Sequence, residues 1–499
     1  MNTKKNNLYA NKYRLIGNEF YKSSKYFEAL RFYNKSLCHA TPMSEEFALS
    51  LANRSAVYFE IEEYDACMEN IKMAIDFGYP IDKVKKLHER YDRCAELIEC
   101  FKKNSENDPW NFFRLSYPAN QQIPYIIDGI ELKESKKYGR HLITTRQLNA
   151  GDIIAIEKPF YKFIMNNSRF THCANCLKSE KLNLLPCHKC NYTMYCSKQC
   201  MSIGHRFHQY ECDIDMKIDQ DSCIFQMCHR VVFEALGIFG KIGKLKAFLE
   251  ANSKPRTIFD HVMSCTSSRG DKEKEKNLLL ATHFLQRNPI QSQLEEPMEK
   301  HCQLMMSITD NVDNKKFLHD FMRHQMGLII TNSFGLIDNS EEVGAGVFPF
   351  ASYFNHSCAP NVYRITYEGK LIFIVIRPIE KNQQLFVCYR ENFFYTDLDA
   401  RQKEIHHAYK FTCNCEACRN NYATLDKLPR HDAKVKISSS NSLPLDTILT
   451  EYEKNCDYIN ANYQKYPSYE ICKLIERNYD LLSFIVCVAT SCLNFTADE

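Results

Sequence analysis

The feature that most constrains this chain is a group of cysteines and one histidine at metal-binding spacing. Two Cys-x2-Cys pairs, a Cys-x3-Cys pair and a His-x3-Cys pair supply eight residues, which are Cys173, Cys176, Cys187, Cys190, Cys196, Cys200, His208 and Cys212. A structural zinc ion takes four Cys or His ligands in a tetrahedron, and ligands a few residues apart can hold one ion together. The eight residues therefore predict two closed zinc sites, with no ligand position left open for water.

The cysteine usage as a whole favours reduced thiols over disulfides. The chain has 24 cysteines in 499 residues, and they cluster at metal-ligand spacings. Residues 1–13 are polar and lack the apolar segment of a secretory signal. The longest apolar run, residues 481–493, is interrupted by Ser and Thr and is too short to span a bilayer. We therefore expect a soluble intracellular protein without membrane association.

Two zinc-related functions are disfavoured by the sequence. Lys and Arg number 64 against 61 Asp and Glu, so the chain has no strong positive field for nucleic acid. Pro186 and the pair Cys187 and Cys190 match half of a zinc-deaminase signature, but no His-x-Glu partner precedes them.

With 499 residues, the chain should contain several domains, each large enough to bury a core.

Residues 10–101 predict a set of helices. Apolar and small residues recur at helical spacing over residues 11–39 and again over residues 48–81, and a third helix is expected over residues 83–101. Each of these two stretches ends near a proline, Pro42 and Pro80, and the separation of the two prolines equals that of the corresponding residues Ala29 and Cys67. The arrangement resembles a pair of tetratricopeptide repeats, and any amphipathic helical hairpin would give part of the pattern. We expect this region to bind protein partners.

A second motif is the Asn-His-Ser-Cys quartet at residues 355–358, which closes an apolar run. Its plain alternative is a loop in which the Asn and Ser side chains bond their own backbone. Short β-rich runs separated by glycine turns occupy residues 123–162, and buried-strand patterns follow the quartet at residues 371–376 and 385–389. Together these features resemble a SET domain, the fold of one large class of protein-lysine methyltransferases.

The resemblance implies a binding site for S-adenosylmethionine. The cofactor-binding residues that it implies are Tyr138, Gly139, Arg140, Asn332, Ser352, Asn355, His356, Tyr389, Tyr409 and Phe411. Asn355 and His356 would hold the charged methionine end, while Tyr409 and Phe411 would wall the adenosine pocket and the lysine channel. Tyr389 takes the place of the family's catalytic tyrosine. Without the resemblance, a tyrosine that ends an apolar strand is more often a core residue, by odds of about 10 to 1.

The resemblance also assigns the metal ligands. The eight-residue group resembles a MYND finger, whose interleaved pattern gives one zinc to Cys173, Cys176, Cys196 and Cys200 and the other zinc to Cys187, Cys190, His208 and Cys212. Three more thiolates follow the SET core, and the family draws the fourth ligand of a third zinc from the quartet. This third set comprises Cys358, Cys413, Cys415 and Cys418. The third zinc would pin the C-terminal segment against the active-site strand.

The expected architecture is an α+β protein whose SET core is split by other modules. The expected boundaries are 10–101 for the tetratricopeptide-like helices, 123–390 for the split SET domain, 173–212 for the inserted finger, 220–320 for a helical insert with a charged loop at 267–276, 391–420 for the post-SET zinc segment and 440–499 for C-terminal helices. This arrangement is similar to the tetratricopeptide-bearing branch of the SET and MYND methyltransferases.

The function that the resemblance implies is methyl transfer from S-adenosylmethionine to a lysine of a protein substrate, histone or non-histone. The repeats and the finger would bind protein partners, and the protein would act in the cytoplasm and the nucleus. The alternative is a scaffold or transcriptional adaptor with a weak or inactive SET core. Retention of Asn355, His356, Tyr389 and the post-SET cysteines favours the enzyme. His141, where relatives often have glycine, and residues 382–384, where they usually have Gly-Glu-Glu, favour caution.

Overall fold

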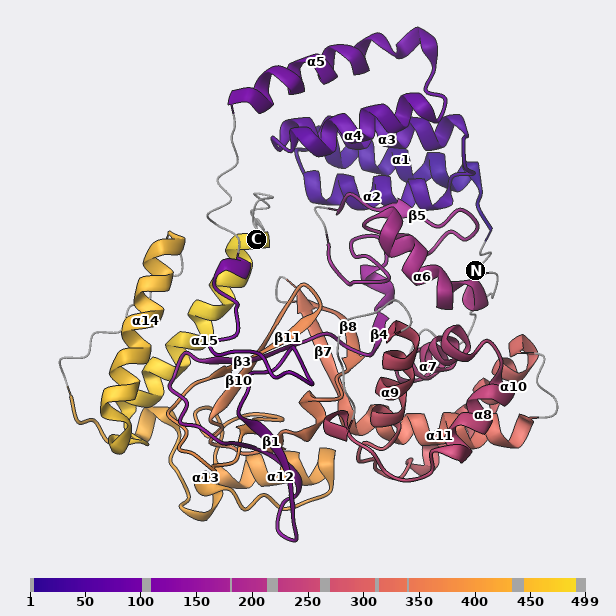
Figure 1. Ribbon diagram of the computed structural model, residues 1–499. Coiled ribbons are helices and arrows are strands. Elements are labelled where there is room, and N and C mark those ends of the chain that lie inside the picture. The colour runs from indigo at the N-terminus through magenta and orange to yellow at the C-terminus, as the bar shows by residue number, and fades with distance from the viewer. Residues whose placement is uncertain are drawn as a thin grey trace.

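The computed structural model describes residues 4–100, 109–179, 182–212, 223–260, 270–309, 314–338, 341–432 and 444–490. Helices stand at one end of the molecule, and the β-rich centre lies between a helical insert and the C-terminal helices (Figure 1). The α+β class predicted from the sequence is confirmed. Short 3-10 turns are η1 (Ile81–Lys83), η3 (Pro109–Asn111), η4 (Asn166–Ser168), η6 (Ile258–Asp260), η7 (Ser292–Leu294), η9 (Ala351–Tyr353), η10 (Leu425–Lys427) and η11 (Tyr463–Lys465).

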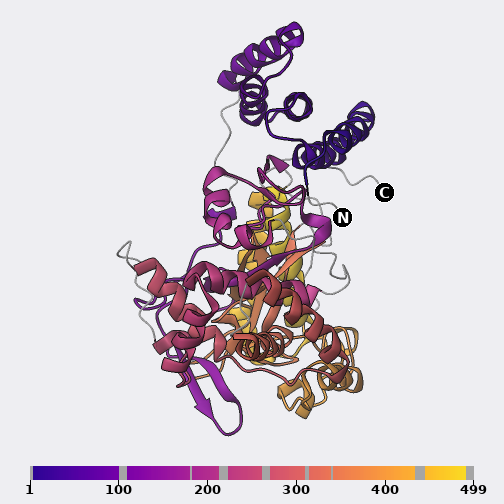
Figure 2. The same cartoon turned by 90° about the vertical axis from the view of Figure 1, so that its right-hand side faces the viewer.

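The N-terminal helices form what we call the helical arm, residues 4–100. Its helices are α1 (Asn7–Lys22), α2 (Tyr26–His39), α3 (Glu45–Glu60), α4 (Tyr64–Asp76) and α5 (Lys85–Cys100). Successive helices pack as hairpins, and Ser44 caps α3 by accepting a hydrogen bond from the Phe47 N–H. A Cβ atom at Gly17 would lie 2.6 Å from the Tyr33 ring, so glycine permits the close approach of α1 and α2. Figure 2 shows the arm at the end of the molecule opposite the β1–β2 hairpin.

The arm packs on the finger, residues 173–212, through buried polar contacts. The Asn34 amide on α2 donates hydrogen bonds to the carbonyl oxygens of Phe170, at 2.9 Å, and Leu182, at 2.7 Å. The fully buried Arg54 on α3 donates to the Leu184 carbonyl at 2.7 Å. One hydrophobic cluster includes side chains from both parts, so arm and finger share a core. Two modules that are separate in sequence are therefore one packed unit.

The central strands pair both with sequence neighbours and, in two of the pairs, with strands far away in the chain. A hairpin consists of β1 (Ile130–Ser135) and β2 (Gly139–Thr144), and the finger contains β5 (Leu185–Pro186) and β6 (Met194–Tyr195). One sheet has the order β10 (Val362–Tyr367), β11 (Lys370–Val375), β3 (Ile153–Glu157), and another the order β4 (Tyr161–Ile164), β8 (Glu341–Val347), β7 (Ser333–Asp338). All these pairs are antiparallel. The finger and the insert thus lie between strands that pair with each other.

The first two residues of the quartet form a short strand. β9 (Asn355–His356) pairs in parallel with β12 (Phe386–Val387). The sequence predicted a strand over residues 385–389, whereas the described strand covers two of them. β12 has this length because its partner is only two residues long and the chain turns away on both sides. The parallel pair places the quartet beside the segment that leads to Tyr389.

The helical insert follows the finger. Its helices, after α6 (Lys198–Glu211) of the finger, are α7 (Cys223–Phe239), α8 (Ile242–Ala251), α9 (Gly270–His283), α10 (Glu295–Thr309) and α11 (Lys315–Asn332). The prediction of a charged loop over residues 267–276 is wrong from residue 270 onward, and residues 267–269 lie outside the described part. Lys and Glu are good helix formers, and Lys276 pairs with Glu273 one turn earlier at 3.5 Å.

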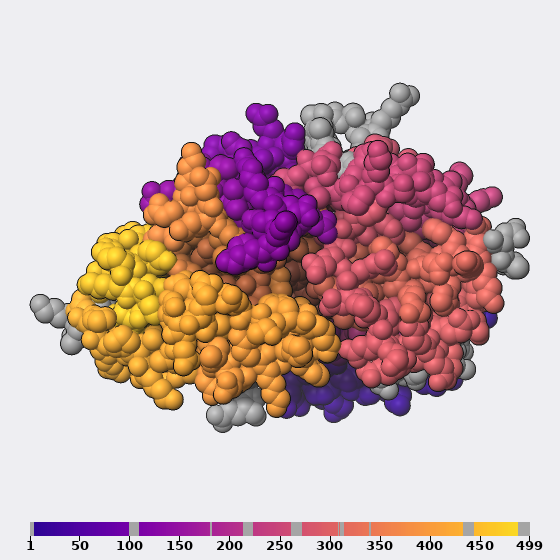
Figure 3. All heavy atoms as spheres, turned by 90° about the horizontal axis from the view of Figure 1, so that it is seen from below, coloured from indigo at the N-terminus to yellow at the C-terminus, as the bar shows by residue number. Residues whose placement is uncertain are grey.

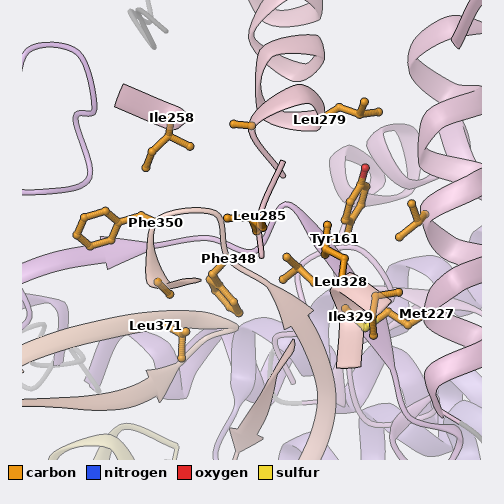
Figure 4. Close-up of a cluster of buried hydrophobic side chains, with 14 of the residues drawn as sticks. Tyr161, Met227, Ile258, Leu279, Leu285, Leu328, Ile329, Phe348, Phe350 and Leu371 are labelled. Carbon is orange, nitrogen blue, oxygen red and sulfur yellow. The ribbon is translucent and has the colours of Figure 1, made fainter. Parts of the chain in front are cut away.

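The insert shares its core with the SET strands (Figure 4). One cluster of buried side chains joins the two parts. It includes Tyr161 of β4, Met227 of α7, Leu328 of α11, Leu371 of β11 and Phe348, which directly follows β8. Full burial of one such side chain contributes about 1.5–3 kcal/mol. No single described helix is long and apolar enough to cross a membrane, and α7 and α8 meet that criterion only together, bent by 85°.

The C-terminal helices cover the other side of the centre. They are α12 (Leu398–Tyr409), α13 (Glu416–Arg419), α14 (Leu445–Asn462) and α15 (Tyr469–Thr490). A second hydrophobic cluster joins Ile372 and Ile374 of β11 to Ile471 and Leu481 of α15. The alternate residues Leu371 and Phe373 face the insert cluster instead, as the two-residue period of a strand requires. Because both faces are covered, β11 reads as a continuous apolar run.

Candidate active site

The first four thiols of the finger meet at one point. Cys173, Cys176, Cys196 and Cys200 have their sulfur atoms within 4.8 Å of one another, and the Sγ atoms of Cys176 and Cys196 are 3.5 Å apart. Sulfurs bound about 2.3 Å from one tetrahedral zinc ion lie about 3.8 Å apart, so the donor set fits that ion. The Asn175 backbone N–H and side-chain amide each donate to a cluster sulfur at 3.4 Å. This is the grouping that the sequence predicted.

The second group in the finger combines three thiols with a histidine. His208 Nε2 lies 3.3 Å from Cys187 Sγ and 3.5 Å from Cys190 Sγ, and Cys212 Sγ lies 3.6 Å from Cys187 Sγ. The other ring nitrogen, Nδ1, is 3.0 Å from the Glu211 carboxylate, which fixes the ring orientation as in known zinc sites. These contacts fit a second tetrahedral ion.

Nearby His172 lies outside this second group. Its Nε2 atom is 2.9 Å from the Asp338 carboxylate, so it ties the finger to β7 instead. The spacing of His208 to Cys212 therefore selects the histidine that meets the thiols.

The third group, which we call the C-terminal cluster, comprises Cys358, Cys413, Cys415 and Cys418. Cys358 follows β9, whereas the other three come from the segment around α13. The Sγ atoms of Cys418 and Cys358 are 3.7 Å apart, and the Cys358 N–H donates to Cys415 Sγ at 3.3 Å. The cluster therefore joins the end of the quartet to a segment more than fifty residues later. Across the described part of the chain, these three groups are the candidate metal centres.

A cavity of about 1050 Å³ opens beside the C-terminal cluster. Seen from below, the surface is hollowed where the β1–β2 hairpin, the insert and the segment around α12 meet (Figure 3). Nine of the ten residues expected to bind the cofactor line it, namely Tyr138, Arg140, Asn332, Ser352, Asn355, His356, Tyr389, Tyr409 and Phe411. Gly139 does not line the cavity, but its φ of 59° lets the hairpin turn beside it.

Several lining side chains use their donors to hold the wall together. Asn332 donates to the carbonyl oxygens of Gln286, at 2.6 Å, and Leu328, at 2.9 Å, and Ser352 donates to that of Phe348 at 2.8 Å. An Arg140 guanidinium nitrogen donates to a carbonyl of the insert at 3.0 Å. The Arg140 bond joins the hairpin to the insert, while the Asn332 and Ser352 bonds stabilise the insert and the segment before the quartet.

The quartet presents hydrogen-bonding groups to the cavity. Asn355 Nδ2 donates to the Tyr138 carbonyl at 3.0 Å, and within the described part of the chain no group donates to Asn355 Oδ1. His356 Nδ1 accepts a hydrogen bond from the Tyr389 backbone N–H at 3.1 Å. The Asn355 oxygen is thus available to a cationic ligand group, while the His356 ring positions Tyr389.

Tyr389 lies at the meeting point of these elements. Its hydroxyl donates to the Phe354 carbonyl at 2.5 Å, and its ring centroid lies 4.9 Å from that of Tyr409 and 5.3 Å from that of His356. Burial raises the pKa of Tyr389 well above its usual value, so the phenol stays protonated at neutral pH. A neutral hydroxyl oxygen, with its proton already donated, can accept a further hydrogen bond.

Sequence reasoning missed several residues of the site. Phe334 and Arg364 line the cavity beside Tyr409, and the Gln384 side chain lines it with neither of its buried polar atoms hydrogen-bonded to the described residues. Glu157 lies behind the quartet segment and accepts hydrogen bonds from two backbone N–H groups there. A charged residue within an otherwise apolar strand was the available signal for Arg364 and Glu157. His141, by contrast, fits the hairpin, with Nδ1 2.8 Å from the Gly139 carbonyl oxygen.

Comparison with known proteins gives a consistent result. The SET-domain family model matches residues 139–390. The chain is 28% identical over 245 residues to protein-lysine N-methyltransferase SMYD4 of Danio rerio, a match that takes in 45% of this chain and 32% of that protein. It is 22% identical over 577 residues to the Homo sapiens protein of the same name, covering 89% of this chain and 71% of the relative.

A further similarity is to histone-lysine N-methyltransferase SMYD3 of Homo sapiens, which is 23% identical over 373 residues, 73% of this chain and 78% of the relative. The match to the Danio rerio protein spans only about a third of that protein's length. The other two matches cover most of this chain.

Proposed function

Because the chain belongs to the SET-domain family and resembles protein-lysine N-methyltransferases over much of its length, we propose that it transfers a methyl group from S-adenosylmethionine to a lysine of a protein substrate. The observation that carries this proposal is the convergence of the quartet, Tyr389, Tyr409 and Phe411 on one cavity. These residues come from three separate segments. A core that had lost its function would need no such convergence.

Polar and aromatic groups of the cavity support binding of S-adenosylmethionine. The cofactor supplies an activated methyl group on a sulfonium, together with an ammonium, a carboxylate and an adenine. Asn355 Oδ1 would accept from the ammonium, and the aromatic faces of Tyr409 and Phe411 would pack against the adenine. The unpartnered Gln384 amide adds buried polar atoms that a polar ligand would satisfy. A volume of about 1050 Å³ is ample for a ligand of this size.

The protein's part in the reaction is alignment and exclusion of water. Methyl transfer is an in-line displacement, so rate depends on holding the attacking amine on the axis of the breaking bond. A free lysine is mostly protonated near neutral pH, and a water-poor channel lowers its pKa toward the neutral, nucleophilic form. The Tyr389 oxygen, fixed by its bond to the Phe354 carbonyl, would accept a hydrogen bond from the amine and orient it.

The three Cys and Cys/His groups would hold zinc in structural roles. Each offers four ligands, which fills a tetrahedral ion and leaves no position for substrate. Two ions would stabilise the finger, and the third would fix Phe411 and the aromatic wall of the cavity to the quartet. The helical arm and the finger would bind protein partners, in keeping with a protein substrate.

The first experiment is calorimetric titration of S-adenosylmethionine into zinc-loaded protein, with Asn355→Ala as the comparison. We expect saturable binding that weakens at least about tenfold in the variant, because a charge-assisted hydrogen bond is lost. Absence of binding to folded, metal-loaded protein would overturn the proposal and favour the adaptor.

Transfer itself is tested with radiolabelled methyl groups on histones and on a proteome digest. Tyr389→Phe should lower turnover by about 10²-fold or more, with cofactor affinity little changed. Tyr395→Phe is the matched control, since Tyr395 is exposed, lies in the following segment and does not line the cavity. Equal turnover in both variants would remove Tyr389 from its catalytic role.

A further inference from the structure

The cavity carries an excess of positive charge. Among the described residues that line it, one is acidic, Glu416, and five are Lys or Arg, which are Lys137, Arg140, Arg364, Arg377 and Arg419. The Glu416 carboxylate already accepts hydrogen bonds from an Arg377 guanidinium nitrogen at 3.3 Å and from the Tyr422 hydroxyl at 2.6 Å. A cleft lined by one sign of charge concentrates ligands of the opposite sign.

Four of the five cations are accounted for by their surroundings. Arg377 pairs with Glu416, while Arg140 and Arg419 donate to backbone carbonyls of the insert and of the C-terminal cluster segment. Four thiolates on one zinc ion carry a net charge of −2, which offsets the two arginines beside that cluster. Lys137 is exposed at the hairpin turn. These charges need no additional partner.

Arg364 is different. Its guanidinium carbon lies 5.1 Å from the centre of the Phe334 ring, and no described residue forms a hydrogen bond or ion pair with it. Burial lowers the pKa of Arg364 below its usual value, an effect that the phenols of Tyr363 and Tyr409 only partly oppose. The Arg364 side chain is half-buried and lines the cavity, and its nitrogens are not among the buried polar atoms that lack a partner in the described part of the chain, so they stay open to the cavity. An anion that enters the cavity can therefore reach the Arg364 guanidinium.

The position of Arg364 identifies the side of the cavity on which such an anion would bind. Arg364 lies on β10, Phe334 lies on β7, and Tyr409 ends α12. The rings of Tyr409 and Tyr389 are 4.9 Å apart, so this wall adjoins the proposed catalytic tyrosine. The groups proposed for the methionine end of the cofactor lie instead at the quartet. Tyr409 is expected to wall both the adenosine pocket and the lysine channel, and we place Arg364 on the lysine-channel side of that wall.

We propose that Arg364 pairs with a carboxylate side chain of the protein substrate, so that the enzyme selects a lysine flanked by glutamate or aspartate. The proposal rests on the methyltransferase function proposed above and names its substrate class. A guanidinium can bind a carboxylate through two parallel hydrogen bonds, which fixes direction as well as charge. The same cation repels a basic flanking residue, so an arginine here both selects and rejects.

The test uses short synthetic peptides with one central lysine. A glutamate, a glutamine or a lysine is placed in turn at each position within three residues of the target. We expect kcat/KM for the best glutamate position to exceed that of its glutamine counterpart by about tenfold or more, which corresponds to about 1.4 kcal/mol. Arg364→Gln should remove this preference, Arg364→Glu should invert it toward lysine-flanked peptides, and Arg364→Lys should retain part of it.

A binding measurement separates this proposal from the proposed function. The same peptides, with norleucine in place of the target lysine, are titrated into protein saturated with S-adenosylhomocysteine. A glutamate preference in binding without any methyl transfer would uphold the role of Arg364 and overturn the enzymatic function. Methyl transfer with no flanking preference, or peptides that fail to bind at all, would overturn the role of Arg364.

Two controls complete the design. Arg390→Gln removes an exposed arginine that does not line the cavity and should leave the preference unchanged. Arg364→Gln should bind S-adenosylmethionine within about twofold of wild type, which also shows that the variant is folded. A loss of cofactor affinity beyond tenfold would assign the guanidinium to the cofactor carboxylate and overturn the proposal.

Discussion

The Glu157 side chain is buried and joins two segments that are distant in the sequence. It is 2% exposed, and its two oxygens accept hydrogen bonds from the backbone N–H groups of Phe350, at 2.8 Å, and Ala351, at 2.9 Å. These two residues lead directly into the quartet. Burial raises the pKa of Glu157 to about 8, although the two N–H donors act in the opposite direction.

This pKa predicts a pH dependence of stability. The folded protein holds a proton on Glu157 that the unfolded chain releases near pH 4.5, so folding stability from this group is greatest at low pH and falls as the pH rises toward 8. Between pH 6 and pH 8 the loss should be about 2 kcal/mol. Chemical unfolding of wild-type protein and Glu157→Gln at several pH values measures it, and the variant should lack this part of the slope.

The control for Glu157→Gln is a carboxylate whose removal should not change the pH dependence of stability. Glu134→Gln removes an exposed carboxylate on β1 and should keep the wild-type slope. Parallel slopes for all three proteins would show that Glu157 is ionised throughout and that its two hydrogen bonds outweigh burial.

At the residue scale, sequence patterns predicted the ligands better than the residues around them. The spacing of Cys173 and Cys176 predicts both as ligands, because two ligands a few residues apart in the sequence can bind the same ion. Glu157 bonds to a backbone 193 positions away, and only the folded sheet brings the two together. Arg364 stood out locally only as a charge within a largely apolar strand, and the strand does not reveal its role, because that role comes from Phe334 and Tyr409 on other elements.

The C-terminal cluster holds together two elements that are too short to be stable alone. β9 is two residues long and α13 is four, and neither would be stable alone. Four thiols from the two segments replace the missing packing. We expect three zinc ions per wild-type chain and two in Cys415→Ser, measured by elemental analysis of dialysed protein.

The same variant should bind S-adenosylmethionine at least about tenfold more weakly, because Phe411 and Tyr409 lose the anchor that follows them. Cys388→Ser is the matched control. Cys388 lies near the cavity, donates to the Arg390 carbonyl at 3.1 Å and belongs to none of the three groups. Cys388→Ser should keep three ions and full affinity, and loss of an ion from it would contradict the ligand assignment.

Element types were more predictable than element lengths. Helical periodicity identified the arm, and the apolar run before Val375 identified β11, because each pattern repeats along its own element. The two-residue strand β12 owes its length to β9, which no periodicity within residues 385–389 could reveal. The helical conformation of residues 270–276 was not predicted, because their run of charged residues was interpreted as a loop. Lysine and glutamate are nevertheless good helix formers.

On the scale of the whole molecule, the arm and the finger are joined by Arg54. Its Nε donates to Asn70 at 2.6 Å and one terminal nitrogen donates to Asn34 at 2.8 Å and to the Leu184 carbonyl at 2.7 Å. Arg54→Ala would leave three acceptors buried without donors. We expect the free energy of local opening of the finger strands and α2 to fall by about 3 kcal/mol, measured by hydrogen exchange.

Arg31→Ala provides the comparison, since Arg31 is partly exposed and pairs with Glu28 on the same helix. It should change local opening by less than about 0.5 kcal/mol. Faster exchange confined to the arm in Arg54→Ala would mean that the finger does not depend on this contact. The sequence predicted the arm and the finger but not that they pack together, because a contact between two modules produces no repeating pattern in the sequence of either one.

The long separation between paired strands has a consequence during synthesis on the ribosome. β4 ends at residue 164 and its partner β8 begins at residue 341, while β3 ends at residue 157 and its partner β11 begins at residue 370. At about 5–20 residues per second, both nascent strands wait roughly 10–40 s for their partners. Exposed strand edges are sites of aggregation.

The arm and the finger, complete by residue 212, have the time to fold and bind metal in that interval. We expect ribosomes stalled near residue 260 to carry a protease-resistant arm and finger with the SET segment still open to cleavage. Zinc supply during translation, more than zinc added afterwards, would then set the yield of intact protein.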